Sequence, residues 1–360
     1  MLELQKMPHA EQAMKRVAAW FEQAILDRVP VRFSRHNSQY DTSTALDTQR
    51  WPNMKARWFD AEYQVDSFLA SLEQATFNAE TFPLYWPNLG PEIYASFFGV
   101  ELEFGEVTSW SKACIHDIEE DDQLEKIRFD PLNPYLKAID AMTRLAVEKC
   151  RGKALVGMSC LGPGIDCVAG WREPQELCMD LILNPDRVKM LMQRSLEPFN
   201  DCYEHFHKIL TSAGQPSIGW MGIPVIGKTH IVQADFSNMI SPAQFNEFCL
   251  PYFDEELKNI DHAIFHMDGK GVAHHLDRLL EIKKIKAIQW VQGVGDDQPI
   301  LQWLPLIRKI QTTGKSVVVD LVPEELEEFI SSMKPEGLFL CISTHNDADQ
   351  PELLKRIQRW

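Results

Sequence analysis

The chain has 360 residues, a hydrophobic fraction of 45% and a charged fraction of 24%, which are typical of a globular protein with a sizeable core. A formal net charge of -16 opposes binding to nucleic acid, because the phosphates would be repelled at long range. The sequence contains no apolar run of membrane-spanning length, no signal-peptide core after its first residues and no paired framework among its eight cysteines, so we expect a cytoplasmic protein with reduced thiols.

The N-terminal part is predicted to combine a helix with two strands. Apolar residues recur at helical spacing over residues 7–26, which indicates an amphipathic helix that forms an N-terminal extension over residues 1–27. Strands are predicted at residues 29–33 and 82–86, separated by a long polar excursion. The segment 100–110 is typical of a hairpin.

The middle of the chain alternates between short apolar runs and long helical sequence. A third strand is predicted at 154–158 and a fourth at 218–221. The helical sequence of 173–212 is broken at Asn184-Pro185, because proline cannot continue the hydrogen-bond ladder. Ser241-Pro242 predicts a new helix, with a cap residue followed by proline at the first helical position.

The last third of the chain repeats strand and helix without a gap. The predicted strands are 263–268, 287–291, 316–320 and 338–342, each followed by helical sequence. About eight such units predict an α/β fold, a single (β/α)8 TIM barrel domain over residues 1–360. A doubly wound open sheet is the competing architecture, because short apolar strands do not reveal whether a sheet closes.

The fifth predicted strand ends in two potential metal ligands, His266 and Asp268, followed by Gly269. Because side chains alternate along a strand, Ile264, His266 and Asp268 are predicted to share one face. An imidazole and a carboxylate on one face can bind the same cation, and the glycine allows a sharp turn. The alternative is an ordinary Asp-Gly turn after a buried strand.

In a barrel, the active site lies at the carboxyl ends of the strands. The residues predicted there, in chain order, are His36, Asn37, Trp86, Asn88, Ser159, Cys160, Trp220, Met221, His266, Asp268, Gln289, Gln292, Asp320, Cys341 and Ser343. The later strands thus supply nitrogen, oxygen and sulfur ligands, a set that suits zinc with one position open for substrate. Cys341 by itself is better explained as a small buried side chain, and only its predicted partners make it a candidate ligand.

Several segments in order resemble the uroporphyrinogen decarboxylase superfamily. They are Asp27-Arg28-Val29-Pro30-Val31, Asn88-Leu89-Gly90-Pro91, Leu161-Gly162-Pro163, Gly170-Trp171-Arg172-Glu173-Pro174, Asn184-Pro185-Asp186, Asp235 with residues 239–252, and His266-Met267-Asp268-Gly269. The superfamily contains porphyrinogen decarboxylases and zinc-dependent methyltransferases that work with corrinoid proteins. The decarboxylases' arginine-rich signature after the first strand does not match residues 31–37.

The methyltransferase branch resembles this chain better. Its zinc ligands, His-x-Cys-Gly after the fifth strand and a cysteine near the last, correspond to His266, Asp268 and Cys341. Asp268 provides oxygen where the family has sulfur, which should leave the zinc a stronger Lewis acid. The sequence lacks a corrinoid-binding Asp-x-His-x-x-Gly motif, so the resemblance implies a corrinoid carried by a separate partner protein, with a small-molecule methyl donor or acceptor.

The remaining polar and aromatic residues at the predicted strand ends are candidates for contact with substrate. Asp235 and Asp320 are the candidate catalytic residues, although each also suits a helix cap or a turn. Trp86, Trp220 and Gln289 are the candidate substrate-binding residues. Two other functions stay open: a metal-free decarboxylase of an acidic pyrrole, and a homologue that binds a small molecule without catalysis.

Overall fold

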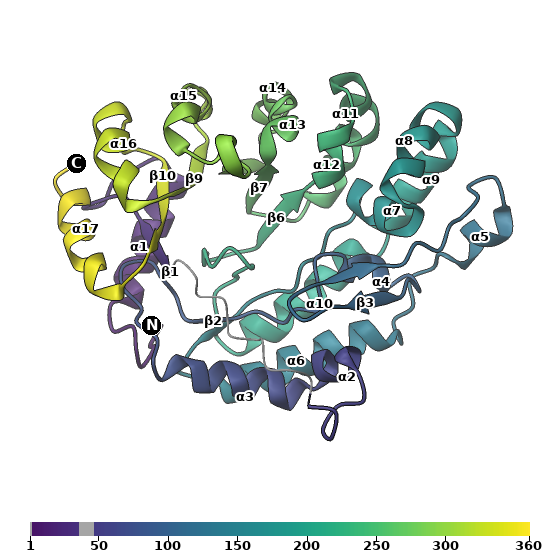
Figure 1. Cartoon of the computed structure of the whole chain (residues 1–360), viewed down its shortest axis with the longest axis horizontal. Helices are drawn as coiled ribbons and strands as arrows, with labels where there is room; N and C mark the ends of the chain where they lie inside the picture. The colour runs from purple at the N-terminus through teal and green to yellow at the C-terminus, as the bar shows by residue number, and fades with distance from the viewer. Residues whose placement is uncertain (1, 36–46) are drawn as a thin grey trace.

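The computed structural model describes residues 2–35 and 47–360, and its largest sheet has six parallel strands in the order β1-β10-β9-β8-β7-β6 (Figure 1). These strands are β1 (Val31–Arg35), β6 (Thr229–Gln233), β7 (His262–Asp268), β8 (Ile285–Val291), β9 (Ser316–Leu321) and β10 (Leu338–Thr344). The first strand pairs with the last and the order never reverses. A doubly wound sheet, in which the strand order reverses at a switch point, is therefore the wrong description.

Two smaller sheets accompany the main one. β2 (Leu84–Tyr85) pairs in parallel with β5 (Leu155–Val156), and β3 (Leu102–Phe104) forms the predicted hairpin with β4 (Ser109–Ser111). The described strands do not form one closed ladder. Isolated hydrogen bonds join the pieces: the Glu80 N–H donates to the Val31 carbonyl at 2.8 Å, and the Met158 N–H to that of Ile218 at 2.8 Å.

The prediction of a fourth strand at 218–221 is wrong. The segment has no strand pairing of its own: an isolated bridge between Ser217 and Val225 flanks it, and the chain turns at Gly222, whose φ is +71°. The strand lies instead at β6, whose polar His230 and Gln233 conceal the short apolar run between them. Sequence periodicity fails here because strand residues of mixed polarity look like a loop.

Helices cover the outside of the strands. α11 to α16 form an arc outside β6 to β10, whereas α3 and α6 lie on the opposite side of the molecule (Figure 1). The helices are α1 (Ala10–Phe21), α2 (Met54–Phe59), α3 (Ala61–Leu72), α4 (Ile93–Ser96), α5 (Asp121–Lys126), α6 (Pro134–Lys149), α7 (Ile165–Arg172), α8 (Pro174–Leu183), α9 (Pro185–Leu196), α10 (Phe199–Ser212), α11 (Pro242–Phe248), α12 (Leu250–Glu256), α13 (Gly269–Ala273), α14 (Leu276–Glu281), α15 (Leu304–Thr312), α16 (Leu326–Ser332) and α17 (Gln350–Ile357). Ser241 caps α11 in a capping box, as predicted. The helical run 173–212 breaks at Pro198 as well as at Pro185.

The sheet separates two hydrophobic cores. The outer core, between strands and helices, contains Phe265 and Trp290. The inner core is lined by alternate strand residues such as Ile264 and Phe339, and α1 packs against it. Trp20 of α1 is fully buried there, and its indole N–H donates to the Gly337 carbonyl at 2.9 Å. The N-terminal helix α1 therefore packs against the inner face of the strands.

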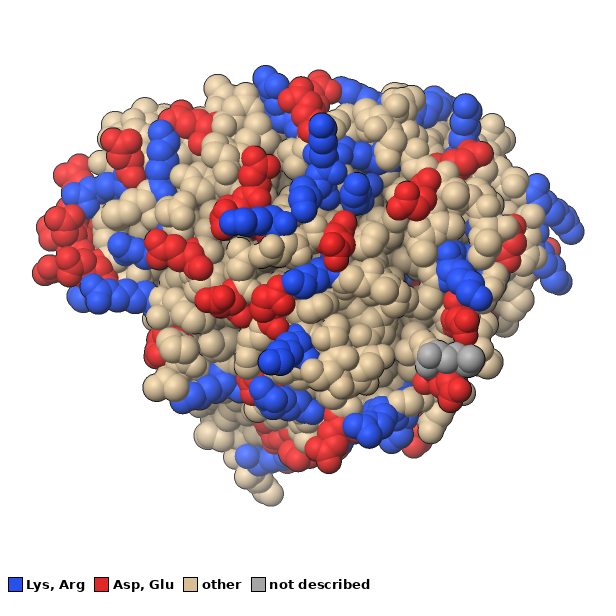
Figure 2. All heavy atoms as spheres, turned by 180° about the vertical axis from the view of Figure 1, so that it is seen from behind, with Lys and Arg blue, Asp and Glu red and all other residues tan. Residues whose placement is uncertain are grey.

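Charge is mixed over the surface. Figure 2 shows Lys, Arg, Asp and Glu side chains interspersed over the back of the molecule, without a continuous basic face on that side. Among the described residues, no helix combines the length and the apolar character needed to cross a bilayer.

Candidate active site

β7 brings His266 and Asp268 to the inner face of the sheet. Ile264 belongs to the inner core and Phe265 to the outer one, which confirms the predicted alternation. Gly269 has a φ of +81°, so the chain turns at the predicted glycine. The His266 Nε2 and Asp268 Oδ2 atoms are 4.0 Å apart.

Gln289 holds the imidazole of His266. The two residues are directly opposite each other on β8 and β7, and the His266 Nδ1 lies 2.7 Å from the Gln289 Oε1. Because an amide oxygen only accepts, the Nδ1–H donates to it, and the Nε2 lone pair is left on the side of Asp268. Gln289 is only 5% exposed, which restricts its movement. This is the arrangement that proteins use to orient a histidine ligand.

A second polar group links the last strands to the first. Arg32 of β1 is opposite Cys341 of β10, which is opposite Asp320 of β9. The Arg32 guanidinium donates to the Met221 carbonyl, and its charge acts on both Cys341 and Asp320. Burial raises the pKa of Cys341 to about 12 despite the nearby guanidinium, and burial also raises the pKa of Asp320. The thiol is therefore protonated at neutral pH in the absence of a metal ion.

Asp235 lies near Asp268, and a further carboxyl group, Asp166, lies against Asp235. Asp235 begins the short 3-10 helix η1 (Asp235–Met239) after β6, and Asp166 of α7 accepts the N–H groups of Asp235 and Phe236, each at 2.9 Å. Burial and the Asp235 charge raise the pKa of Asp166 to about 7. Burial and the Asp268 charge raise the pKa of Asp235, but Asp235 is exposed at the rim, where water screens these effects. Asp166, which is half-buried, is the better defined proton-binding group.

The raised pKa of Asp166 predicts a pH-dependent stability. Between its ordinary pKa near 4 and its folded value of about 7, the folded protein binds this proton more tightly than the unfolded chain does. The free energy of unfolding should therefore fall as the pH rises from 5 to 8, by up to about 1.4 kcal/mol per pH unit for one group. Asp166→Asn should flatten this dependence in urea unfolding curves. Asp254→Asn, at an exposed position on α12, is the control, and equal pH dependence in both variants would contradict the assignment.

The tryptophans predicted to contact substrate lie in different places. Trp220 packs against the inner core, and its ring lies edge-on to His266, with centroids 5.2 Å apart. Trp86 packs against the outer core, and its indole N–H is buried without a partner among the described residues. The structure thus brings Trp220, but not Trp86, into contact with His266. His36 and Asn37, predicted after the first strand, lie outside the described residues.

The donor set fits zinc in part. Two ligand atoms about 2 Å from a tetrahedral zinc ion lie roughly 3.3 Å apart, so the His266 Nε2 and Asp268 Oδ2 atoms, at 4.0 Å, would have to approach each other to bind one ion. Within residues 2–35 and 47–360, no three His, Cys, Asp or Glu side chains already surround one metal-sized point. Cys341 would complete the predicted set only after its sulfur moves towards the other two ligands.

Sequence reasoning missed Arg32 and Asp166. A signal for Arg32 was present, because it alternates with Val31 and Phe33 in the first predicted strand and therefore faces the opposite side. Asp166 had no comparable signal, since its role depends on a backbone contact with residues about 70 positions away.

Known structures offer a comparison for the fold, although no protein-family model and no curated protein matches the sequence. A methyltransferase from Methanosarcina mazei superimposes with a TM-score of 0.60 over 96% of this chain and 98% of that chain, at 12% identity. The chain therefore has the overall α/β fold of that methyltransferase.

Proposed function

We propose that this protein is a zinc-dependent methyltransferase that moves a methyl group between a small substrate or thiol and a separate corrinoid protein. The main support for the proposal lies at the carboxyl ends of the strands. There Gln289 orients the His266 ring by a hydrogen bond, so that the free Nε2 lies on the side of Asp268. The fold shared with a methyltransferase supports it.

We also infer that the strands form a (β/α)8 barrel of the uroporphyrinogen decarboxylase type. The pairing of β1 with β10 and the unreversed strand order support this inference. The gap between β1 and β2 is spanned by the Glu80–Val31 hydrogen bond, and residues 217–218 bridge the gap between β5 and β6. The inner face then forms the barrel interior, closed below by α1.

In this proposal His266, Asp268 and Cys341 hold the metal. When bound, zinc lowers the pKa of a coordinated thiol or withdraws charge from a leaving group. Gln289 fixes the imidazole, Arg32 and Asp320 lie opposite Cys341 on the neighbouring strands, and Trp220 packs edge-on against His266. Asp235, exposed at the rim, orients the substrate.

Metal removal tests the proposal. Purified protein should contain about one zinc per chain, and it should demethylate methylcobalamin, the probe methyl donor, in the presence of a thiol. Treatment with a chelator should stop the reaction, and zinc should restore it. Full activity in protein that contains no zinc would refute the mechanism.

Gln289 provides a second prediction. Gln289→Met keeps the volume but removes the oxygen that accepts the His266 Nδ1–H, so the zinc affinity should fall about 10- to 100-fold. Gln289→Glu keeps an oxygen at this position and should bind zinc at least as tightly as the wild type. Competition with a chromogenic chelator measures both affinities. Unchanged affinity in Gln289→Met would show that the amide does not orient a ligand.

A metal-free decarboxylase has less support. A substrate with several carboxylates requires several cations, and the polar groups described here include one guanidinium, Arg32, which already faces Asp320. The acidic Asp166, Asp235 and Asp268 would repel such a substrate.

A further inference from the structure

A surface cavity of about 400 Å³, broadly open to solvent, lies in the helical part of the molecule. It is bounded by Phe98 after α4, by the segment 127–129 after α5, and by the end of α9 with Glu197 and Pro198. None of these residues lies on a strand or follows a strand of the six-stranded sheet. The volume is within the range of small-molecule sites, and the proposed methyl transfer does not use the cavity.

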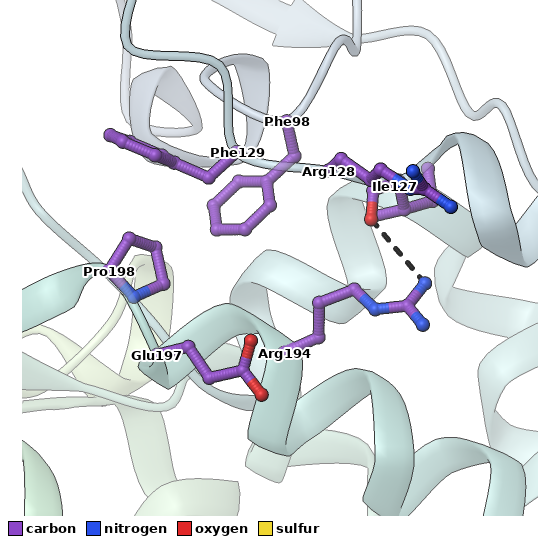
Figure 3. A pocket seen from close by; sticks show the side chains of 7 residues that line it. All are labelled: Phe98, Ile127, Arg128, Phe129, Arg194, Glu197 and Pro198. Carbon is purple, nitrogen blue, oxygen red and sulfur yellow. Dashed lines mark hydrogen bonds between the residues drawn. The ribbon is translucent and has the colours of Figure 1, made fainter.

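One side of the cavity is apolar. The rings of Phe98 and Phe129 meet edge-on with centroids 5.8 Å apart, and Pro198 lies beside them (Figure 3). Phe98 is itself held from behind by the buried Trp171 at 4.9 Å. Phe98 is fully buried, so the surface open to a ligand here is formed by the half-buried Phe129 and Pro198, and Phe129 favours an aromatic ring in an edge-on or offset arrangement.

The other side carries charge. The Arg194 guanidinium lies across from the aromatic rings, and one of its nitrogens, Nη1, donates to the carbonyls of Leu124 and Ile127 (Figure 3). Its remaining N–H groups have no partner within the part of the chain that the structure describes. The same holds for the side chains of Arg128 and Glu197, which are exposed and make no ion pair with described residues.

We propose that this cavity binds a small zwitterion with an aromatic group, such as an aromatic α-amino acid. Its ring would lie against Phe129 and Pro198, its carboxylate would face Arg128 and Arg194, and its ammonium group would face Glu197. This set of contacts uses every free polar group around the cavity. Neither an aromatic acid nor an aromatic amine alone would do so.

Binding of three related probes tests the proposal: L-phenylalanine, 3-phenylpropionate, which lacks the ammonium group, and phenethylamine, which lacks the carboxylate. Titration calorimetry of the full chain should show that L-phenylalanine binds more tightly than either analogue. Arg128→Met and Glu197→Gln should each weaken its binding about threefold or more. Both residues are exposed, so these variants should fold normally.

Arg187→Met is the matched control, because Arg187 lies on α9 outside the cavity and pairs with Asp121 at 2.6 Å. It should leave the affinity unchanged. Equal affinities for the three probes, or no loss in Arg128→Met and Glu197→Gln, would overturn the proposal. The methyl-transfer assay is not a readout here, so the two proposals fail separately.

Discussion

Replacement of His266 by alanine should weaken zinc binding by more than about 100-fold, the upper range for loss of a residue that only supports a ligand. Methyl transfer should be lost with the metal, because the imidazole is the ligand that Gln289 holds in place. Zinc content per chain, zinc affinity by competition, and demethylation of methylcobalamin should be measured on the same preparation.

His205→Ala is the matched control for this variant. His205 is an exposed histidine on α10, 2.6 Å from Asp140. Its removal should leave zinc content and transfer unchanged. If His266→Ala retained zinc but lost transfer, the imidazole would act on the substrate, and the proposed ligand set would be wrong.

Glu80→Ala should lower the free energy of unfolding by about 3–5 kcal/mol, the usual loss when one partner of a buried ion pair is removed. Glu80 is fully buried, and its carboxylate accepts two hydrogen bonds from the Arg28 guanidinium, at 2.7 and 3.0 Å. It also accepts hydrogen bonds from Arg16 at 3.1 Å and from the Val31 N–H at 2.7 Å. Without the carboxylate, the buried Arg28 guanidinium loses its two hydrogen bonds to Glu80, and β1 loses an anchor to the segment before β2.

Urea unfolding at neutral pH measures this loss. Glu103→Ala is the control, because its ion pair with Lys112 is at the surface and should contribute less than about 1 kcal/mol. Glu80→Gln should be less damaging than Glu80→Ala, since it retains an acceptor oxygen. A loss as small as that of Glu103→Ala would mean that Glu80 does not anchor β1.

The strands β7 to β10 follow from the sequence pattern because each contains a short apolar run followed by helical sequence. The alternation of Ile264 and Phe265 between two cores, the turn at Gly269 and the cap at Ser241 all depend on residues adjacent in sequence. The clustering of the polar residues at the ends of these strands was also predictable. Successive parallel strands place their carboxyl ends at the same edge of the sheet.

What could not be predicted depends on contacts between distant residues. β6 was missed because its polar residues hide a short apolar run, and the predicted strand at 218–221 is in fact a turn. The role of Gln289 as the partner of His266, rather than a residue free to contact substrate, depends on the register of β7 and β8. The position of Cys341 against Arg32 likewise required the pairing of the first and last strands.

The pairing of β1 with β10 also has a consequence for biosynthesis. Val31 lies opposite Leu340, and the Trp20 indole donates to Gly337, a residue 317 positions later. During translation, the N-terminal segment can therefore form its contacts with Glu80 early, but its contacts with β10 only after residues 337–344 have been synthesised. Completion of the sheet depends on these contacts of large sequence separation, which slow folding.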